Sequence, residues 1–238
     1  MMKLSRFSKL AFVGIAATGL VLGGCSDDPE PPKEPKIEIP HTKRDVGAQA
    51  TWAQYKIPVK DEGPYEVMEY SPPGNGDRLC ISSVLESNRN ATAQECVVRN
   101  SDKKLFLQGD IGEQKPLATY TLSNNVFSES FIVVEFSPVN DPGTLCVHVR
   151  PDGYSEGDDL RCIQVPEGAL SAQGHLEKRT TDIQYTVHNR DNKVINSSFS
   201  LAAAPTMNCT VSYMYGNASG TTLVCNTGSA DMNTPILI

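Results

Sequence analysis

The 238-residue sequence lacks several of the short motifs by which enzyme families are identified. It contains no H-E-x-x-H and no glycine-rich phosphate loop, so the common zinc-protease and nucleotide-binding signatures are absent. Histidine is scarce, with four in the chain, and His148 lies in a strand-like segment where we expect a structural role. The sequence therefore predicts a non-catalytic protein without a cofactor. An enzyme whose catalytic residues meet only in space is kept as a third functional hypothesis.

Positive charge is also in short supply. The chain has 21 Lys and Arg against 28 Asp and Glu, which gives a formal net charge of −7. An acidic surface repels phosphate backbones, so the composition argues against a nucleic-acid partner. Sustained helical periodicity is missing too, and only residues 167–178 could form one or two helical turns. What remains are short aromatic and β-branched segments between turn residues, the pattern of an all-β fold.

Only one long apolar run occurs, and it lies near the N-terminus. Residues 10–24 (LAFVGIAATGLVLGG) are apolar or small, but they are fewer than a membrane-spanning helix needs. They follow three cations, Lys3, Arg6 and Lys9. A basic segment followed by a short apolar run is typical of a secretory signal peptide. An ordinary signal peptide that ends by chance at a cysteine is the alternative interpretation.

The residues Leu22-Gly23-Gly24-Cys25 resemble the lipobox of bacterial lipoproteins, and the resemblance covers residues 1–26. It implies cleavage of residues 1–24 and a lipidated Cys25, with a diacylglycerol and an N-linked acyl chain such as palmitate. Ser26 resembles the residue that follows the cysteine in lipoproteins passed to the outer membrane. We therefore expect an exported lipoprotein in the outer membrane, facing either the periplasm or the outside. Loss of the three N-terminal cations changes the formal charge from −7 to −10.

The segment after the lipidated cysteine has the composition of a tether. Residues 25–49 contain five prolines and frequent charges, without apolar periodicity. Such a segment forms an extended, semi-rigid spacer. At about 3.1 Å per residue it reaches on the order of 75 Å, which holds the folded part away from the membrane surface.

Six further cysteines show that the rest of the chain is triplicated. They form three pairs, each sixteen residues apart: Cys80 and Cys96, Cys146 and Cys162, Cys209 and Cys225. Upstream of the pairs, Tyr55, Tyr120 and Tyr185 recur at a spacing of 65 residues. The phrase EYSPPGNGDRLC at 69–80 returns as EFSPVNDPGTLC at 135–146 and, in degenerate form, as SFSLAAAPTMNC at 198–209. We predict three β-repeats, at residues 50–112, 113–177 and 178–238.

The cysteine spacing predicts one disulfide per repeat. Residues that face each other across a hairpin sum to a constant, so each turn should lie midway between its two cysteines, near residues 88, 154 and 217. The sequence there is rich in Asn, Asp, Gly and Ser, which tolerate tight turns. Six cysteines allow fifteen connectivities, and the repeat favours the three local pairs. Each closed loop stabilises the fold by roughly 3 kcal/mol in the chain-entropy model. Metal ligation is the alternative, but knuckle spacing is missing.

Two arrangements of the repeats satisfy these observations. The first is three tandem, disulfide-stapled modules of about 65 residues, each a small β-sandwich or barrel. The alternative is one β-domain closed around a pseudo-threefold axis. The separate disulfides and the repeat length favour the first.

The predicted hairpin tips carry the candidate binding residues. Four carboxylates, Asp152, Glu156, Asp158 and Asp159, crowd the second tip and offer the hard oxygen ligands that calcium prefers, although the EF-hand pattern is not met. We interpret this tip as a solvated turn, with calcium as the alternative.

Tyrosines at the second and third tips are the other candidates. Tyr154 lies on the second tip, and Tyr213 and Tyr215 alternate with Met214 so that both point to one face of the third hairpin. Tyrosine on a projecting loop is a common contact residue for proteins and glycans, and it is also an ordinary strand residue.

These observations favour a membrane-anchored, non-catalytic binding or structural lipoprotein of the bacterial envelope or cell surface. Its partner would be a protein or a glycan, engaged in adhesion or assembly. The alternative is an inhibitor of a hydrolase, which inserts a disulfide-closed loop into the active site at little entropic cost.

Overall fold

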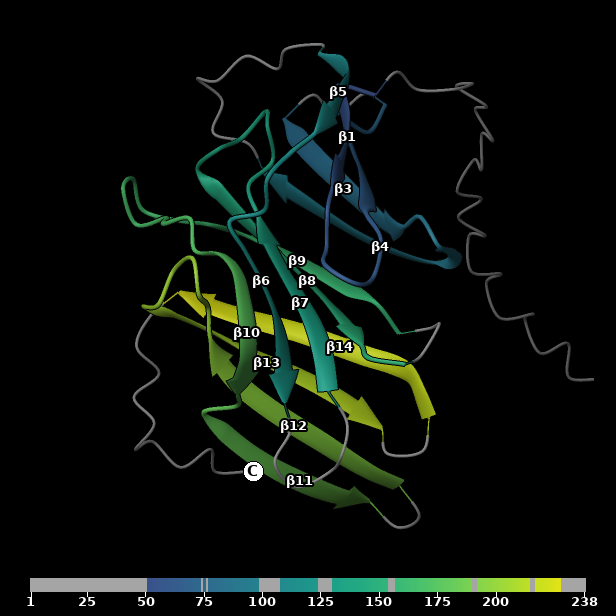
Figure 1. Cartoon of the computed structure of the whole chain (residues 1–238), viewed down its shortest axis with the longest axis vertical. Helices are drawn as coiled ribbons and strands as arrows, with labels where there is room; N and C mark the ends of the chain where they lie inside the picture. The colour runs from purple at the N-terminus through teal and green to yellow at the C-terminus, as the bar shows by residue number, and fades with distance from the viewer. Residues whose placement is uncertain are drawn as a thin grey trace, which may run out of the picture. The chain divides into compact units, whose positions relative to one another are not determined.

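The computed structural model describes residues 51–73, 75, 77–98, 108–123, 130–153, 157–189, 192–214 and 217–227. The expected signal peptide, Cys25 and the tether lie outside the described residues. Within that part of the chain every helix or strand is a β-strand, and the strands form three sheets (Figure 1). The prediction of an all-β fold built from three repeats is therefore confirmed.

Sheet A comes from the first repeat and has five strands. Four run antiparallel in a meander, and the fifth lies outside the first and parallel to it, in the order β4-β3-β2-β1-β5. The strands are β1 (Ala53–Ile57), β2 (Tyr65–Tyr70), β3 (Arg78–Leu85), β4 (Asn88–Val98) and β5 (Gly109–Glu113).

Sheet B repeats this topology, with its fifth strand again parallel to its first, in the order β10-β6-β7-β8-β9. The strands are β6 (Ala118–Ser123), β7 (Ser130–Phe136), β8 (Thr144–Pro151), β9 (Asp159–Gln164) and β10 (Gly174–Thr180).

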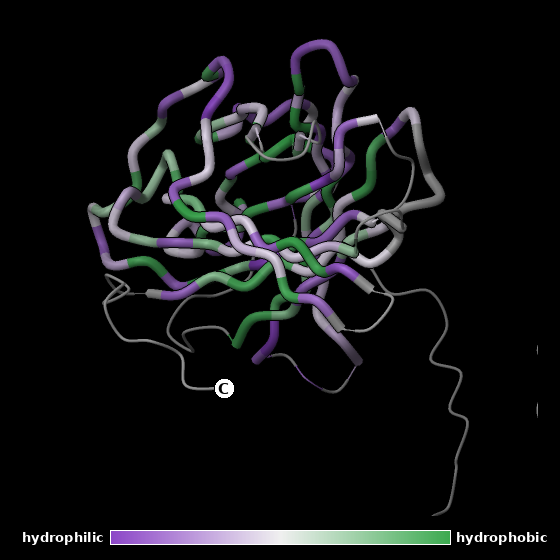
Figure 2. The backbone as a smooth tube through the Cα atoms, turned by 90° about the horizontal axis from the view of Figure 1, so that it is seen from below, coloured by the Kyte–Doolittle hydropathy of each residue, from purple (hydrophilic) through white to green (hydrophobic). Residues whose placement is uncertain are grey.

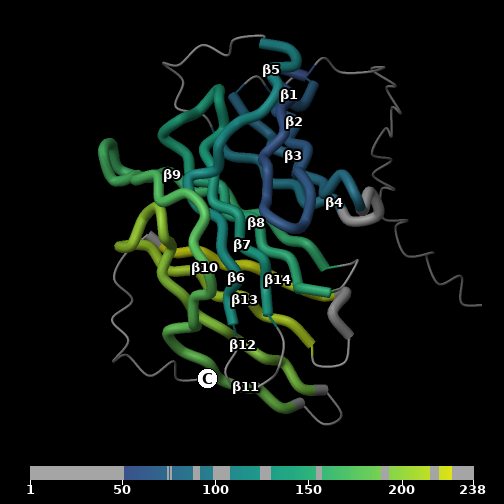
Figure 3. The backbone as a smooth tube through the Cα atoms, in the orientation of Figure 1, coloured from purple at the N-terminus to yellow at the C-terminus, as the bar shows by residue number. Residues whose placement is uncertain are grey.

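Sheet C has the four antiparallel strands of the meander, in the order β11-β12-β13-β14. The strands are β11 (Ile183–Asn189), β12 (Asn192–Ser200), β13 (Met207–Met214) and β14 (Asn217–Thr227). In Figure 3 the colour runs from the mostly purple and blue strands of sheet A, through the teal and green strands of sheet B, to the green and yellow strands of sheet C.

The sheets form three layers, with sheet B in the middle. All eight residues of β8 are buried, because sheet A covers one face of this strand and sheet C the other. Strands of the outer sheets alternate instead, as in β2 (YEVMEY) and β13 (MNCTVSYM), where buried residues alternate with more exposed ones. Hydrophilic and hydrophobic residues alternate along much of the chain in Figure 2. The layer order thus decides which strands alternate and which are apolar on both faces.

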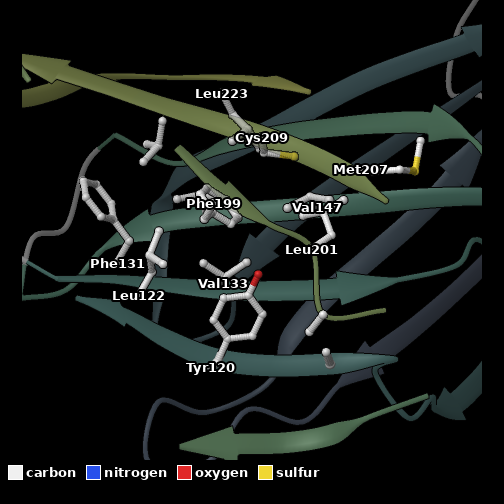
Figure 4. Packing of buried hydrophobic residues seen from close by; sticks show 14 of the residues in the cluster. Tyr120, Leu122, Phe131, Val133, Val147, Phe199, Leu201, Met207, Cys209 and Leu223 are labelled. Atoms are coloured by element: carbon white, nitrogen blue, oxygen red, sulfur yellow. The ribbon is translucent and has the colours of Figure 1, made fainter. Parts of the chain in front are cut away.

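Each of the two hydrophobic cores lies between successive repeats. The first joins residues of sheet A, such as Tyr55 and Val67, to Val134 and Phe136 of sheet B. The second joins the other face of sheet B to sheet C, and Figure 4 shows Tyr120, Val133 and Phe199 packed within it. The sandwich-like packing that the repeats suggested is therefore formed between repeats, and each repeat supplies one open sheet.

The three disulfides join the pairs that the spacing predicts, each within one hairpin. Cys80 pairs with Cys96, Cys146 with Cys162 and Cys209 with Cys225. The paired cysteines are direct cross-strand neighbours, with Cα atoms 4.0, 4.0 and 4.1 Å apart. Such short separations are typical of non-hydrogen-bonded antiparallel pairs.

The expected helical turns at residues 167–178 are wrong. This segment contains a turn and then β10, which begins at Gly174 and pairs with β6. The local sequence could not show this, because the partner strand lies more than fifty residues away. The predicted boundary between residues 177 and 178 consequently falls inside β10.

Candidate interaction surface

A buried tyrosine–glutamate pair joins each of the first two sheets to the next repeat. In sheet A the hydroxyl of Tyr55 donates to Glu69 at 2.9 Å, and the same carboxylate accepts the backbone N–H groups of Val139 and Asn140 at 2.6 and 3.1 Å. The side-chain amide of Asn140 donates to it as well, at 2.9 Å. Glu69 is fully buried and is satisfied by four donors. The loop of the second repeat is therefore fixed on the first sheet.

Sheet B uses the same device one repeat later. Tyr120 donates to Glu135 at 2.7 Å, and Glu135 accepts the N–H groups of Ala202 and Ala203 at 2.8 and 2.6 Å. Arg179 from β10 lies over the Tyr120 ring, with 4.8 Å from its guanidinium carbon to the ring centroid. These contacts fix the loop of the third repeat on sheet B. We call this Tyr–Glu–amide arrangement the carboxylate clamp.

Burial shifts the titration of the clamp residues. The pKa of Tyr120 is raised well above its ordinary value, first by burial and then by the negative charge of Glu135. The pKa of Tyr55 is raised for the same reasons, with Glu69 as the neighbour. Burial also raises the pKa of Glu135, although its hydrogen-bond donors oppose that shift. Both tyrosines therefore remain protonated donors across the physiological range.

The third repeat keeps the tyrosine but not the clamp. Tyr185 lies 65 residues after Tyr120, yet it is 47% exposed where Tyr55 and Tyr120 are 1% and 2% exposed. The position of the glutamate is taken by Ser198, which pairs with Ile183 as Glu69 pairs with Ala53. Ser198 exchanges a 2.8 Å hydrogen bond with Thr210 of its own sheet. In the described chain, no further sheet lies on this side of sheet C.

Three cross-strand rows on the face of sheet C that carries Tyr185 contain no charged side chain. We define the outer face by these rows, which point away from sheet B: Ile183, Ser198, Thr210 and Val224; Tyr185, Asn196, Ser212 and Thr222; Val187, Val194 and Met214. None of these eleven residues is ionisable apart from the tyrosine. The outward face of sheet A differs, since it carries Lys56, Glu66 and Arg78.

Exposed apolar side chains gather on the outer face. Six large hydrophobic residues are exposed in the described chain, and five of them lie there: Ile183, Tyr185, Val187, Met214 and Val224. Single exposed hydrophobics are normal, but a contiguous group marks an interaction site. The polar residues between them satisfy one another, as Ser212 donates to Asn196 at 2.6 Å. The surface can therefore be covered by a partner with little desolvation cost.

The sequence predicts that tyrosines near the hairpin tips are available to a partner. For Tyr213 this prediction is wrong, because the side chain is buried. Tyr213 is 3% exposed and packs edge-on against Phe131, with 5.1 Å between the ring centroids. The side of β13 that carries Tyr213 faces sheet B, so Tyr213 is a core residue. Tyr154 and Tyr215 lie outside the described residues. The tyrosine that is available to a partner is Tyr185, on a strand.

The described carboxylates of the acidic tip differ in their surroundings, since Asp152 is exposed whereas Asp158 and Asp159 are less so. Asp159 accepts the N–H groups of Leu160 and Leu223 at 2.8 and 2.6 Å, which joins sheet B to sheet C. Asp152 accepts the hydroxyl of Ser130 at 2.7 Å. Glu156 lies outside the described residues, and the described chain contains no cluster of three or more side chains that could hold a metal. The described carboxylates therefore bind separate partners and do not converge on one site.

Asp158 belongs to a polar cluster between sheets A and B. The Nε2 atom of His148 lies 3.4 Å from its carboxylate, and Nδ1 lies 3.3 Å from the hydroxyl of Ser83. These are the residue types of a hydrolase triad, but a nucleophile must be accessible to its substrate. Ser83 and His148 are each 1% exposed. The cluster therefore links β3 of the first repeat to β8 of the second, in agreement with the structural role expected for His148.

The fold and this surface define the protein as a three-layer stack of β-repeats with one uncharged end face. Comparisons with protein families, with curated proteins and with solved structures find no match to the chain. In the described residues, no helix is long and apolar enough to cross a membrane.

Proposed function

We propose that the protein is a membrane-anchored, non-catalytic binding or structural lipoprotein of the bacterial envelope, and that the outer face of sheet C is its contact surface. The lipobox-like N-terminus supports the lipid anchor at Cys25, and the proline-rich tether supports presentation of the repeats away from the membrane. The disulfides agree with an exported protein, since they persist in oxidising compartments.

The observation that carries the proposal is the contrast among equivalent faces. The faces around Tyr55 and Tyr120 are each covered by the next sheet, whereas no sheet of the described residues covers the face around Tyr185, which is rich in exposed apolar side chains. The equivalent face of the first and of the second repeat therefore forms an interface within the molecule. The equivalent face of the third repeat is available for an interface with another molecule.

The chemistry of the outer face indicates the kind of partner. Because the two equivalent faces are covered by β-sheets, and because no charge is present to be paired, the partner should present an uncharged sheet face of its own. Sheets pack face to face about 10 Å apart through interdigitating apolar side chains, and Ile183, Tyr185 and Val187 along β11 supply them. Such a partner suits an assembly component of the envelope or cell surface.

Site-specific photocrosslinking in intact cells that naturally produce the protein would test the proposal. A benzophenone amino acid at position 185 should give a crosslinked adduct with another polypeptide. The same probe at Gln94, an exposed residue on the outward face of sheet A, is the matched control and should give none. Val187→Glu, which places a charge on the outer face, should reduce the adduct at 185 by about tenfold or more, as for loss of an interface contact of about 1.4 kcal/mol.

Two results would overturn the proposal. One is the absence of any adduct at position 185, and the other is equal labelling from positions 185 and 94. An adduct of twice the chain's mass would identify the partner as a second copy of the protein in place of a different one.

A further inference from the structure

A pocket lies where the chain passes from sheet A to sheet B. Among the described residues, the first hydrophobic core takes its sheet B members from β7, β8 and β9 and none from β6 or β10. The side of β6 and β10 that faces sheet A therefore lines a cavity, and the segment that follows β1 forms its opposite wall. The volume of this pocket is about 500 Å³, within the range of small-molecule sites.

The described lining of this pocket combines positive and apolar side chains. Its ionisable members are Lys60, Lys115 and His175, and none of its described members is a carboxylate. The formal net charge of the whole chain is −7, so the positive charge here is a local feature. We call this site the cationic pocket. Its apolar members are Pro58, Val59, Pro116 and Ala172.

Neither lysine of the cationic pocket is neutralised within the described chain. The ion pairs found there engage other cations, and Lys60 and Lys115 take part in none of them. Lys60 follows β1 and Lys115 precedes β6, so the two ammonium groups come from segments far apart in the sequence. Like charges that line one cavity repel each other, and an anion bound between them replaces this repulsion by attraction.

A buried threonine holds the histidine of the cationic pocket. His175 pairs with Thr119 across β10 and β6, and its Nδ1 atom lies 3.1 Å from the threonine hydroxyl oxygen. Thr119 is itself 3% exposed, so its packing limits where the imidazole ring can lie. Donation by the hydroxyl to Nδ1 places the proton of the neutral ring on Nε2, which then donates to an anion.

We propose that the cationic pocket binds the phosphate group of a small phosphate monoester. A phosphate monoester carries a charge of about −1.5 to −2 at pH 7, which the two lysines match. A carboxylate or a phosphate diester carries a single negative charge and leaves one ammonium group unmatched. The imidazole adds a hydrogen-bond donor for a phosphate oxygen. This inference rests on sheets A and B and does not depend on the outer face of sheet C.

A neighbouring pocket limits the rest of the ligand. It has a volume of about 310 Å³, and four residues line both pockets: Val59, Lys60, Thr119 and His175. It is also lined by Asp61 and Glu177, which form no ion pair in the described chain. These carboxylates repel a second anionic group and attract an ammonium group. The expected ligand is therefore a monoester whose other groups are neutral or cationic, and phosphoethanolamine is a simple probe of this kind.

Titration of the purified full chain with phosphoethanolamine, followed by heteronuclear NMR, tests the assignment. The amide signals of Thr119, Gly174 and His175, which line the cationic pocket, should shift and reach saturation. The amide signal of Thr210, on the outer face of sheet C, should not shift and is the internal control.

Two comparison ligands test the charge of the bound group. β-Alanine carries a carboxylate in place of the phosphate, and glycerophosphoethanolamine is a diester with one negative charge. Both should bind about tenfold more weakly, or weaker still, because one ammonium group stays unmatched. The diester also separates a soluble monoester from a phospholipid headgroup, which is a diester as well.

A matched pair of lysine substitutions tests the site itself. Lys115→Gln removes one charge of the cationic pocket and should weaken phosphoethanolamine binding by about tenfold or more. Lys56→Gln removes the same charge from the outward face of sheet A, where the lysine pairs with Glu86. Because that position does not line the pocket and solvent screens distant charges, its dissociation constant should change by less than about twofold.

Three results would each refute the phosphate assignment. The first is the absence of saturable shifts at Thr119, Gly174 and His175. The second is binding of β-alanine or of the diester that is as tight as that of phosphoethanolamine. The third is an equal loss of affinity in Lys115→Gln and Lys56→Gln, which would show that net charge alone attracts the ligand. Thermal melts of both variants confirm that each is folded.

Discussion

Two buried glutamates determine how the repeats of this protein are joined. Glu69 and Glu135 are each fully buried, and each accepts one tyrosine hydroxyl and at least two backbone N–H groups of the following repeat. A buried carboxylate is costly unless such donors surround it, and hydrogen bonds to charged groups contribute about 1.5–3 kcal/mol each. Removal of one partner would leave the others unsatisfied, so the clamp acts as a unit.

The clamp makes a prediction about pH. Because burial raises the pKa of Glu135 above its unfolded value, the folded chain binds this proton more tightly than the unfolded chain does. The contribution of Glu135 to the free energy of unfolding is therefore largest below the unfolded pKa, about 4.3, and decreases as the pH rises through the raised folded pKa. The change amounts to about 1.4 kcal/mol for each unit by which the pKa is raised.

Denaturant unfolding of the wild type and of Glu135→Gln between pH 4 and 8 measures this contribution. The free energy of unfolding of the wild type, minus that of the variant, should fall as the pH rises. A difference that is constant across this range, or that rises with pH, would contradict the assignment.

At the scale of elements, equivalent strands differ in what covers them. β6 and β11 occupy the same place in their repeats. Among the described strands, β6 is covered by sheet C and flanked by β10, whereas β11 is an edge strand that no further sheet covers. The tyrosine side chain is the same in both strands, but its burial differs. We therefore expect the buried Tyr120 to contribute more to the free energy of unfolding than the half-exposed Tyr185.

Alanine substitutions of the two tyrosines test this difference. Tyr120→Ala leaves a cavity and removes one of the donors to the buried Glu135 carboxylate, and it should lower the free energy of unfolding by about 3–5 kcal/mol. Tyr185→Ala removes a half-exposed ring and should change it by less than about 1 kcal/mol. Thermal and denaturant melts give both values. Equal losses would show that Tyr185 is buried by something other than the described chain.

The sequence revealed the features that depend on local spacing. The sixteen-residue cysteine pairs determined the hairpin register, and the 65-residue tyrosine spacing determined the repeat. The fifth strands β5 and β10 could not be predicted, because a parallel partner is remote in sequence and a short polar segment such as GHLEKRT carries no signal of its own.

Only part of the candidate site could be predicted from the sequence. Period-two alternation placed Tyr213 and Tyr215 on one face, but the layer order that makes the Tyr213 face internal is a tertiary property. The change from Glu69 and Glu135 to Ser198 was visible when the three phrases are aligned. Its meaning became clear only once the glutamates were seen to bind the next repeat.

At the scale of the whole molecule, the repeats are held together by more than the clamps. Arg161 on β9 donates to the carbonyl of Leu223 in sheet C at 2.7 Å and lies 3.1 Å from Glu95 of sheet A. The middle sheet therefore contacts both neighbours through one side chain. These contacts join the three sheets into one stack.

The anchor is tested on the whole protein. Cys25→Ser removes the residue that the lipobox resemblance marks for lipidation, and it should release the protein into the soluble fraction or leave it unprocessed in the inner membrane. Ser26→Ala is the matched control and should remain in the membrane pellet. Cell fractionation with immunoblotting measures both. A normally processed Cys25→Ser protein in the outer-membrane pellet would contradict the proposal, unless it is released when contacts of the outer face are disrupted by Val187→Glu.

The replacement of glutamate by Ser198 removes from the third repeat the group that binds the following repeat in the other two. A fourth repeat of the same kind, placed against sheet C, would bring a loop with two inward N–H groups and would meet a hydroxyl already engaged with Thr210. The carboxylate clamp can therefore join the first sheet to the second repeat and the second sheet to the third, but it cannot join a further repeat to sheet C. In engineering terms, lengthening the stack by the same device would require a carboxylate at position 198 before a fourth repeat is added.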